Sequence, residues 1–117
     1  MAVPFDEVRL HNRRVLVVDD TQEIRYLASR YIMDAGGRPD MASGGEAAIE
    51  VIEAAAVTDP FDALILDIHM PGMDGYEVAR TLRAKGFRIT IIALTAGAMV
   101  GDREKCLQAG CDDYLTK

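Results

Sequence analysis

Hydrophobic residues along the chain are grouped in short runs that alternate with longer, striped segments. The runs at residues 13–18, 62–67 and 88–94 are rich in Val, Ile and Leu, which predicts buried β-strands. Two less apolar segments, residues 38–42 and 111–116, are predicted to form short strands. Because three of these strands are apolar almost throughout, we expect both of their faces to be covered, as in a parallel sheet.

Helical stripes occupy the intervals between the strands. Apolar residues recur three and four positions apart between residues 24 and 35, and Gly36 follows as a stop signal. A second stripe runs from residue 47 to residue 55. Ser43 and Glu46 precede it with the spacing of a capping box, which predicts that Ser43 caps this helix.

Two further helices follow in the second half of the chain. Asp74 and Glu77 are placed to cap the third helix, Gly86 ends it, and its apolar face consists of Val78, Ala79 and Leu82. The fourth is predicted over residues 99–109. Five strands alternating with four helices, joined by right-handed crossovers, form an open parallel α/β sheet with helices on both faces. Ligands of such sheets bind at the carboxyl ends of the strands.

The composition is that of one compact domain with an acidic surface. The chain has 117 residues, 50% of them hydrophobic, and a formal net charge of −6. Because nothing in such a chain would neutralise an extended row of phosphates, we expect no direct nucleic-acid binding. No apolar stretch approaches ~20 residues, so we expect no membrane contact and a cytoplasmic location. Residues 1–12, which include Pro4 and lack periodicity, are interpreted as a leader or linker before a domain at residues 13–117.

A polar residue follows or closes four of the predicted strands. Asp19 and Asp20 follow the first strand, Asp67 closes the third, Thr95 follows the fourth and Lys117 follows the fifth. The carboxyl ends of parallel strands meet at one edge of the sheet, so these side chains are expected to point into one crevice.

Three carboxylates in one crevice repel one another unless a cation is present. Oxygen ligands with room for water favour Mg²⁺, with Mn²⁺ as an alternative. Asp20 and Asp67 are the expected carboxylate ligands, with Asp19 close by through water. The backbone carbonyl of His69 is expected to complete the protein's share of the ligands.

Lys117 and Thr95 add an ammonium group and a hydroxyl to this predicted crevice. A metal ion, a cation and a hydroxyl around a carboxylate are suited to receive a phosphoryl group, because phosphoryl transfer depends mainly on positioning and charge neutralisation. Asp67 is the candidate nucleophile, since carboxylates form covalent aspartyl phosphates.

Each of these residues also has a simpler interpretation. Asp20 or Thr21 could cap the first helix, Thr95 could cap a strand end, and Lys117 could be a solvated terminal lysine. Asp67 is hardest to explain in this way, because an unpaired acid at the end of a buried strand costs free energy. The shared position of all these residues at strand ends favours the site.

Five other residues invite a chemical role but have a more ordinary explanation. His69 lies on a loop, which is unsuited to phosphotransfer through its ring. Met70 and Met73 lack the histidine cluster of a copper site and are predicted to be packing residues. The only cysteines, Cys106 and Cys111, are interpreted as small buried hydrophobes in a reducing compartment.

Taken together, these motifs resemble the receiver domains of two-component response regulators. The matching stretches are "VLVVDD", "LILDIHMPGMDG", "IIALTA" and "GCDDYLTK", in the family's order and spacing over residues 13–117. The resemblance implies a flavodoxin-like, doubly wound five-stranded parallel sheet with strand order 2-1-3-4-5. The family normally continues with a fifth helix, which is absent from this chain.

The resemblance also assigns a role to each matching residue. It implies that a histidine kinase or a histidine phosphotransfer domain donates a phosphoryl group, and that the domain catalyses its own phosphorylation and dephosphorylation without being a kinase. The implied roles are phosphoacceptor for Asp67, acidic metal pair for Asp19 and Asp20, switch hydroxyl for Thr95, phosphoryl-contacting cation for Lys117 and aromatic switch for Tyr114.

The sequence of residues 91–117 resembles receivers fused to hybrid sensor histidine kinases, which would tether the domain to a membrane protein. Without the fifth helix, one flank of the sheet is expected to be uncovered and to favour a homodimer or a swapped assembly. Two alternatives to signalling are a phosphorylation-independent adaptor and a phosphatase of the haloacid-dehalogenase type. The second fits poorly, because that class has an acid two residues after its nucleophile, where this chain has His69.

Overall fold

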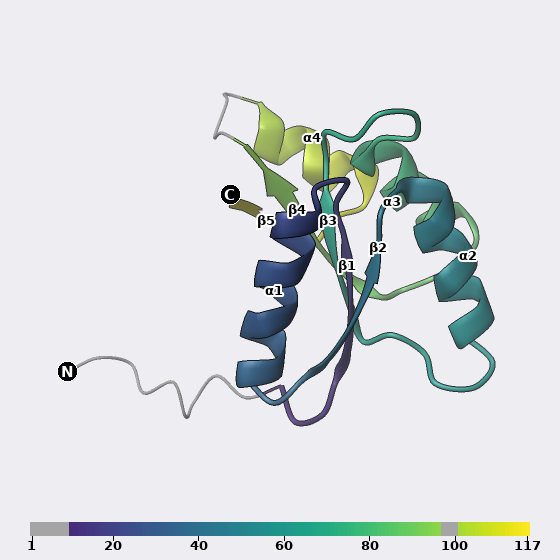
Figure 1. Cartoon of the computed structure of the whole chain (residues 1–117). Helices are drawn as coiled ribbons and strands as arrows, with labels where there is room; N and C mark the ends of the chain where they lie inside the picture. Colours follow the sequence, from purple (N-terminus) through teal and green to yellow (C-terminus); the bar gives the residue numbers. More distant parts are fainter. Residues whose placement is uncertain (1–9, 97–100) are drawn as a thin grey trace.

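The computed structural model describes residues 10–96 and 101–117 and consists of one parallel sheet with helices on both faces (Figure 1). The strand order is β2-β1-β3-β4-β5, as predicted for a flavodoxin-like fold. In chain order, the elements are β1 (Arg14–Val18), α1 (Gln22–Asp34), β2 (Arg38–Ala42), α2 (Gly45–Ala55), β3 (Ala63–Asp67), α3 (Gly75–Ala84), β4 (Thr90–Thr95), α4 (Asp102–Ala109) and β5 (Asp113–Thr116).

The element boundaries near the carboxyl end of the chain differ from the prediction. Strand β5 begins at Asp113 because Asp112 bridges to β4, accepting from the Ile91 N–H with Oδ2 and donating its own N–H to the Ile91 carbonyl. Strand β4 begins at Thr90 and includes Thr95. Helix α4 begins at Asp102, and residues 99 and 100 of the predicted helix lie outside the described residues.

Alternate side chains of the strands point into two cores. Leu16 and Val18 belong to the larger core, which α2, α3 and α4 cover together with buried residues of β3 and β4. Val15 and Val17 belong to a smaller cluster with Ile32 of α1. The sheet is therefore covered on both faces at β1, as its apolar sequence predicts.

Coverage on the α1 face is incomplete. Helix α1 lies over β1 and β2, and within the described part of the chain no helix lies over β4 and β5 on this side (Figure 1). As a result, Leu27 and Tyr31 of α1 are 51% and 68% exposed, and Leu115 of β5 is 54% exposed. An apolar face therefore extends from α1 to β5.

The helix amino termini confirm one predicted cap and contradict another. Asp74 caps α3, because its Oδ1 accepts a hydrogen bond from the Glu77 N–H at 2.9 Å. The predicted capping box at Ser43 is wrong: Gly44 occupies the cap position of α2, and no side chain caps it. The extra glycine moves the helix start one residue beyond the reach of Ser43.

The buried sulfur-containing residues have the packing roles that were predicted. Cys106 and Cys111 are buried free thiols in the larger core. Met70 is also in that core, and Met73 packs against it. Among the described residues, no helix has the length and apolar character to cross a membrane.

Candidate functional site

The site lies where the order of the strands reverses, between β1 and β3. Val18 pairs with Leu66 in the parallel register, so the residues that follow them, Asp19 and Asp67, lie side by side. Carboxylate oxygens of Asp19, Asp20 and Asp67 all lie within 4.8 Å of one another. Asp19 and Asp67 are buried, whereas Asp20 is exposed. The structure thus brings together the three acids that the sequence placed at strand ends.

Lys117 reaches this acidic cluster from β5. Its Nζ lies 3.1 Å from Asp19 Oδ2 and 3.2 Å from Asp67 Oδ1. Its main-chain N–H donates to the carbonyl of Thr95 at 2.7 Å, which continues the β4–β5 pairing to the edge of the sheet. Lys117 is therefore not the solvated terminal lysine of the simpler interpretation, because both of its acidic partners are buried.

Asp19 forms hydrogen bonds through both its side chain and its main chain. Its Oδ1 accepts from the Thr21 N–H at 2.8 Å, and its own N–H donates to the Ala42 carbonyl of β2 at 3.2 Å. Thr21 occupies the cap position of α1 but makes no capping hydrogen bond with its side chain. The acidic pair is thus not explained as a cap of α1.

Asp67 has one oxygen engaged and one without a hydrogen bond. Oδ1 accepts from the His69 N–H at 3.2 Å and faces Lys117. Oδ2 is buried and has no hydrogen-bond partner in the part of the chain that the structure describes. Buried carboxylate oxygens are almost always paired, so this one indicates a missing partner.

Burial and the charges at the site shift the pKa values of two groups, Asp67 and Lys117. Burial, and then the neighbouring charge of Asp19, raise the pKa of Asp67, while Lys117 and the His69 N–H oppose that rise. Partial burial lowers the pKa of Lys117, but the carboxylates of Asp19 and Asp67 outweigh it and raise that pKa above its ordinary value. The cluster therefore favours the charged form of Lys117 and disfavours the ionised form of Asp67 relative to the same groups in water.

The donor set fits a hard divalent cation. All three clustered groups are carboxylates, and Asp67 Oδ2 is a buried oxygen without a hydrogen bond among the described residues. Asp20 makes neither a hydrogen bond nor an ion pair within those residues, and its exposure leaves room for water ligands. This acidic cluster is consistent with a Mg²⁺ site.

Thr95, Tyr114 and His69 occupy different environments around the acids. Thr95 ends β4 next to Lys117 and is 2% exposed. Tyr114 on β5 is half-buried and packs against the larger core. His69 is exposed, and its backbone N–H already contacts Asp67.

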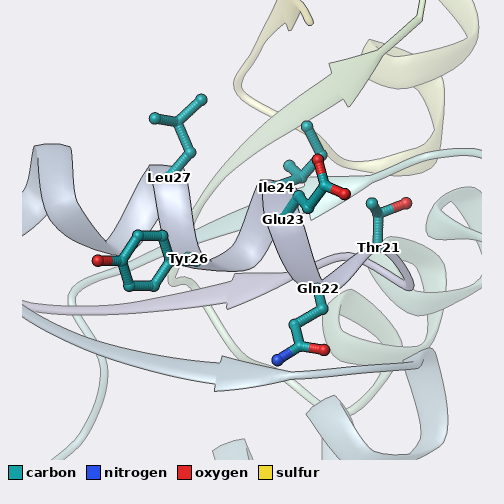
Figure 2. A pocket seen from close by; sticks show the side chains of 6 residues that line it. All are labelled: Thr21, Gln22, Glu23, Ile24, Tyr26 and Leu27. Carbon is teal, nitrogen blue, oxygen red and sulfur yellow. The ribbon is translucent and has the colours of Figure 1, made fainter.

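An open hollow lies along the start of α1. It has a volume of about 620 Å³, and its lining begins at Thr21, the residue after Asp20. Figure 2 shows the lining side chains: Thr21, Gln22, Glu23, Ile24, Tyr26 and Leu27. The hollow therefore follows the acidic cluster directly in sequence, although none of the three acids lines it.

One contact at the site was missed by reasoning from sequence. Arg25 of α1 donates from Nη1 to the main-chain carbonyl of Asp19 at 2.7 Å. A carbonyl that leaves a strand needs a new donor, and Arg25 is the first basic residue along the chain after Asp19. The exposed strand-end carbonyl and the nearby arginine were thus the features of the sequence from which this contact could have been predicted.

Comparisons with known proteins agree with this geometry. A family model described as the response regulator receiver domain matches residues 15–117. The response regulator MprA of Mycobacterium ulcerans is 42% identical over 104 residues, which cover 89% of this chain and 43% of MprA. The sensor histidine kinase GacS of Pseudomonas protegens is 38% identical over 109 residues, covering 89% of this chain and 12% of GacS. The chain thus spans less than half the length of either relative.

A solved structure with the same fold contains a metal complex. The response regulator TrrA from Thermotoga maritima, determined in complex with Mg²⁺-BeF, is 36% identical to this chain. Its TM-score is 0.76, over 90% of this chain and 86% of TrrA.

Proposed function

Because the chain belongs to the family of response regulator receiver domains, we propose that Asp67 accepts a phosphoryl group from a phosphohistidine of a partner protein. The observation that carries the proposal is the state of the two Asp67 oxygens: Oδ2 is buried without a hydrogen bond among the described residues, while Oδ1 lies 3.2 Å from the Lys117 ammonium. The exposed carboxylate of Asp20 lies in the same cluster. A nucleophile, a cation and a metal-binding acid at one point are the components of phosphoryl transfer.

The chemistry follows from the residues around Asp67. Its carboxylate attacks phosphorus, the bond from phosphorus to the imidazole nitrogen breaks, and the imidazole leaves with the electron pair of that bond. Lys117 neutralises one phosphoryl oxygen, and the hydroxyl of Thr95 donates to another. When Mg²⁺ is bound, it neutralises further negative charge on the phosphoryl group. Asp19, Asp20, Asp67 and the carbonyl of His69 are the proposed protein contacts of the metal, with Mn²⁺ as a substitute.

The phosphorylated domain would differ from the free domain mainly in charge. A phosphoryl group adds a charge of about −1.5 to −2 at neutral pH. We infer that Thr95 and Lys117 move towards this charge and that the ring of Tyr114 turns further into the core behind Thr95. Hydrolysis of the aspartyl phosphate by the same site would reset the switch. The domain is therefore an acceptor that catalyses its own modification, not a kinase.

Receiver domains of this family partner with histidine kinases. For this chain, the proposed donor is a histidine kinase or a histidine phosphotransfer domain that docks at the hollow beside Asp20.

The similarity to GacS supports a receiver within a hybrid kinase, in the cytoplasm and tethered through that larger protein. We further propose that residues 1–12 are a linker and that the receiver domain begins at residue 13. The uncovered face from α1 to β5 is the proposed surface for a homodimer or a swapped assembly.

Incubation with a small phosphodonor and Mg²⁺ tests this function. We expect one phosphoryl group per chain, located on Asp67 by tandem mass spectrometry, stable in acid and labile in base. Chelation of the metal should prevent the modification. Asp62→Asn is a matched control, because Asp62 is an exposed acid near the opposite end of β3. Equal modification of Asp67→Asn and the wild type would overturn the assignment.

A further inference from the structure

The carbonyl of Asp19 depends on a side chain from the following helix. Arg25 Nη1 donates to this carbonyl at 2.7 Å, in a partly buried contact. Within the described part of the chain, no other group donates to the carbonyl. This contact spans the turn from β1 to α1. The main-chain N–H of Arg25 donates to the Thr21 carbonyl at 3.1 Å, so Arg25 itself is held in the first turn of the helix.

The position of this carbonyl makes the contact relevant to the acids. The Asp19 carbonyl belongs to the peptide unit that joins Asp19 to Asp20, so its direction sets the orientation of that peptide plane. On the other side of Asp19, the N–H is fixed by Ala42 of β2. Asp20 itself has no side-chain partner among the described residues, so the orientation of its carboxylate depends on the backbone.

We propose that Arg25 is a positioning residue for the metal-binding acids, which fixes the Asp19–Asp20 peptide so that Asp20 points at the cation. This inference rests on the proposed function, because it requires that the cluster bind Mg²⁺. Arg25 touches neither the metal nor the phosphoryl group. It acts only through the backbone carbonyl of Asp19. In this way, the orientation of the metal-binding acids depends on the first turn of α1.

Mg²⁺ titration of the full chain tests the proposal. Removing a group that orients a metal ligand typically weakens metal affinity by about 10- to 100-fold, and we expect Arg25→Gln to weaken Mg²⁺ binding by about tenfold by calorimetry. The phosphorylation rate should show the same shift in its half-saturating Mg²⁺ concentration and recover to near the wild-type rate when Mg²⁺ is saturating. An unchanged Mg²⁺ affinity in Arg25→Gln would overturn the proposal.

Two further variants separate positioning from charge. Arg30→Gln removes the same charge from the same helix, where Arg30 is exposed and contacts the hydroxyl of Tyr26, and its Mg²⁺ affinity should match the wild type. Arg25→Lys keeps the charge but changes the reach and the geometry of the donor, and should restore the affinity only in part. Full restoration by lysine, or an equal loss in Arg30→Gln, would show that charge alone acts and would contradict the proposal.

A measurement without metal keeps this inference separate from the proposed function. Thr21 donates its N–H to Asp19 Oδ1, so exchange of this amide with solvent reports on the same turn. We expect amide exchange at Thr21 to be faster in Arg25→Gln than in the wild type. Absence of Mg²⁺ binding by the wild type would contradict the proposed function, whereas unchanged exchange at Thr21 would contradict the role of Arg25.

Discussion

At the scale of single residues, the site holds two buried carboxylates against one ammonium. Asp19 and Asp67 lie within reach of Lys117, but Asp67 Oδ2 has no hydrogen bond in the described part of the chain. Burial and the charge of Asp19 raise the pKa of Asp67, so its ionised form destabilises the metal-free domain. The residue that is proposed to react is thus also a source of instability.

Asp67→Asn should stabilise the metal-free domain at neutral pH. The folded-state pKa of Asp67 is above its unfolded value, so its favourable contribution is fully present below about pH 3.9 and is lost as pH rises through the folded pKa. The melting temperature of the variant should exceed that of the wild type by about 2–4 °C at pH 7. The difference should shrink as the pH approaches 4.

The control for this change is Glu50→Gln, an exposed acid on α2. It should leave the melting temperature unchanged over the same pH range. A lower melting temperature for Asp67→Asn than for the wild type at pH 7 would contradict the inference that the buried, ionised Asp67 destabilises the domain.

Lys117→Met should separate metal binding from phosphoryl acceptance. Lys117 Nζ contacts the same carboxylates that would hold the cation, so the two positive charges compete. We expect Mg²⁺ to bind the variant several-fold more tightly, because the competing ammonium is gone, while phosphorylation of Asp67 becomes slower. Calorimetry and phosphorylation kinetics check the two parts. Weaker Mg²⁺ binding in the variant would contradict the competition.

At the scale of elements, the turn from β3 to α3 holds the backbone of Asp67, the proposed phosphoacceptor, close to the start of the helix. Gly75 begins α3, and a Cβ built on it would lie 2.5 Å from the Asp67 carbonyl oxygen and 2.7 Å from Ile68 Cα. Its N–H donates to the Ile68 carbonyl at 2.9 Å. The two nearest neighbours are backbone atoms, so movement of the third, Ile68 Cδ1 at 2.8 Å, would not make room for a Cβ.

Gly75→Ala should therefore destabilise the domain and displace Asp67. Overpacking against backbone is expected to cost about 2 kcal/mol in the free energy of unfolding, measured with denaturant. Phosphorylation should slow even under conditions in which the variant is folded. Gly44→Ala is the control, because a Cβ there meets nothing within 4 Å, and it should cost at most about 0.5 kcal/mol. Equal stability of the two variants would contradict the close approach at Gly75.

The elements differ in how well the sequence predicts them. The apolar runs of β1 and β3 predicted both strands to within one residue, and Asp74 was recognised as a cap because its spacing to Glu77 is local. The start of α2 was wrong because Gly44, and not Ser43, occupies the extended cap position, and the Ser43–Glu46 spacing alone does not distinguish the two. The start of β5 was also wrong, because it depends on the contact between Asp112 and Ile91 in a different strand.

The same distinction applies to the site. Topology alone brings Asp19, Asp67 and Lys117 together, because the strands that precede them are neighbours and parallel. The hydrogen bond from Arg25 and the unpartnered Asp67 oxygen depend on side-chain conformation, which a periodic pattern does not specify. The positions of the acids and of Lys117 were therefore predictable, whereas these side-chain contacts were not.

At the scale of the whole molecule, the helices among the described residues cover the two faces of the sheet unequally. Helices α2, α3 and α4 cover one side of the sheet, whereas α1 covers only β1 and β2 on the other (Figure 1). The exposed apolar residues Leu27, Tyr31 and Leu115 lie on the α1 side. Apolar faces of this kind favour association.

We expect this chain to self-associate through that face. Leu27→Gln should weaken the association about tenfold or more by sedimentation, because burial of one leucine contributes roughly 1.5–3 kcal/mol. Val57→Gln is the control: Val57 is 85% exposed, lies after α2 and is remote from the face. A loss of association in Val57→Gln equal to that in Leu27→Gln would contradict the assigned surface.

The most direct test of the account is to trap the acyl phosphate on its residue. After phosphorylation in the presence of Mg²⁺, borohydride reduces an aspartyl phosphate to homoserine, which mass spectrometry distinguishes from aspartate. We predict homoserine at position 67 alone, and none when the metal is chelated before the donor is added. Homoserine at position 19 or 20, or a phosphoryl group that survives borohydride on another side chain, would contradict the central claim.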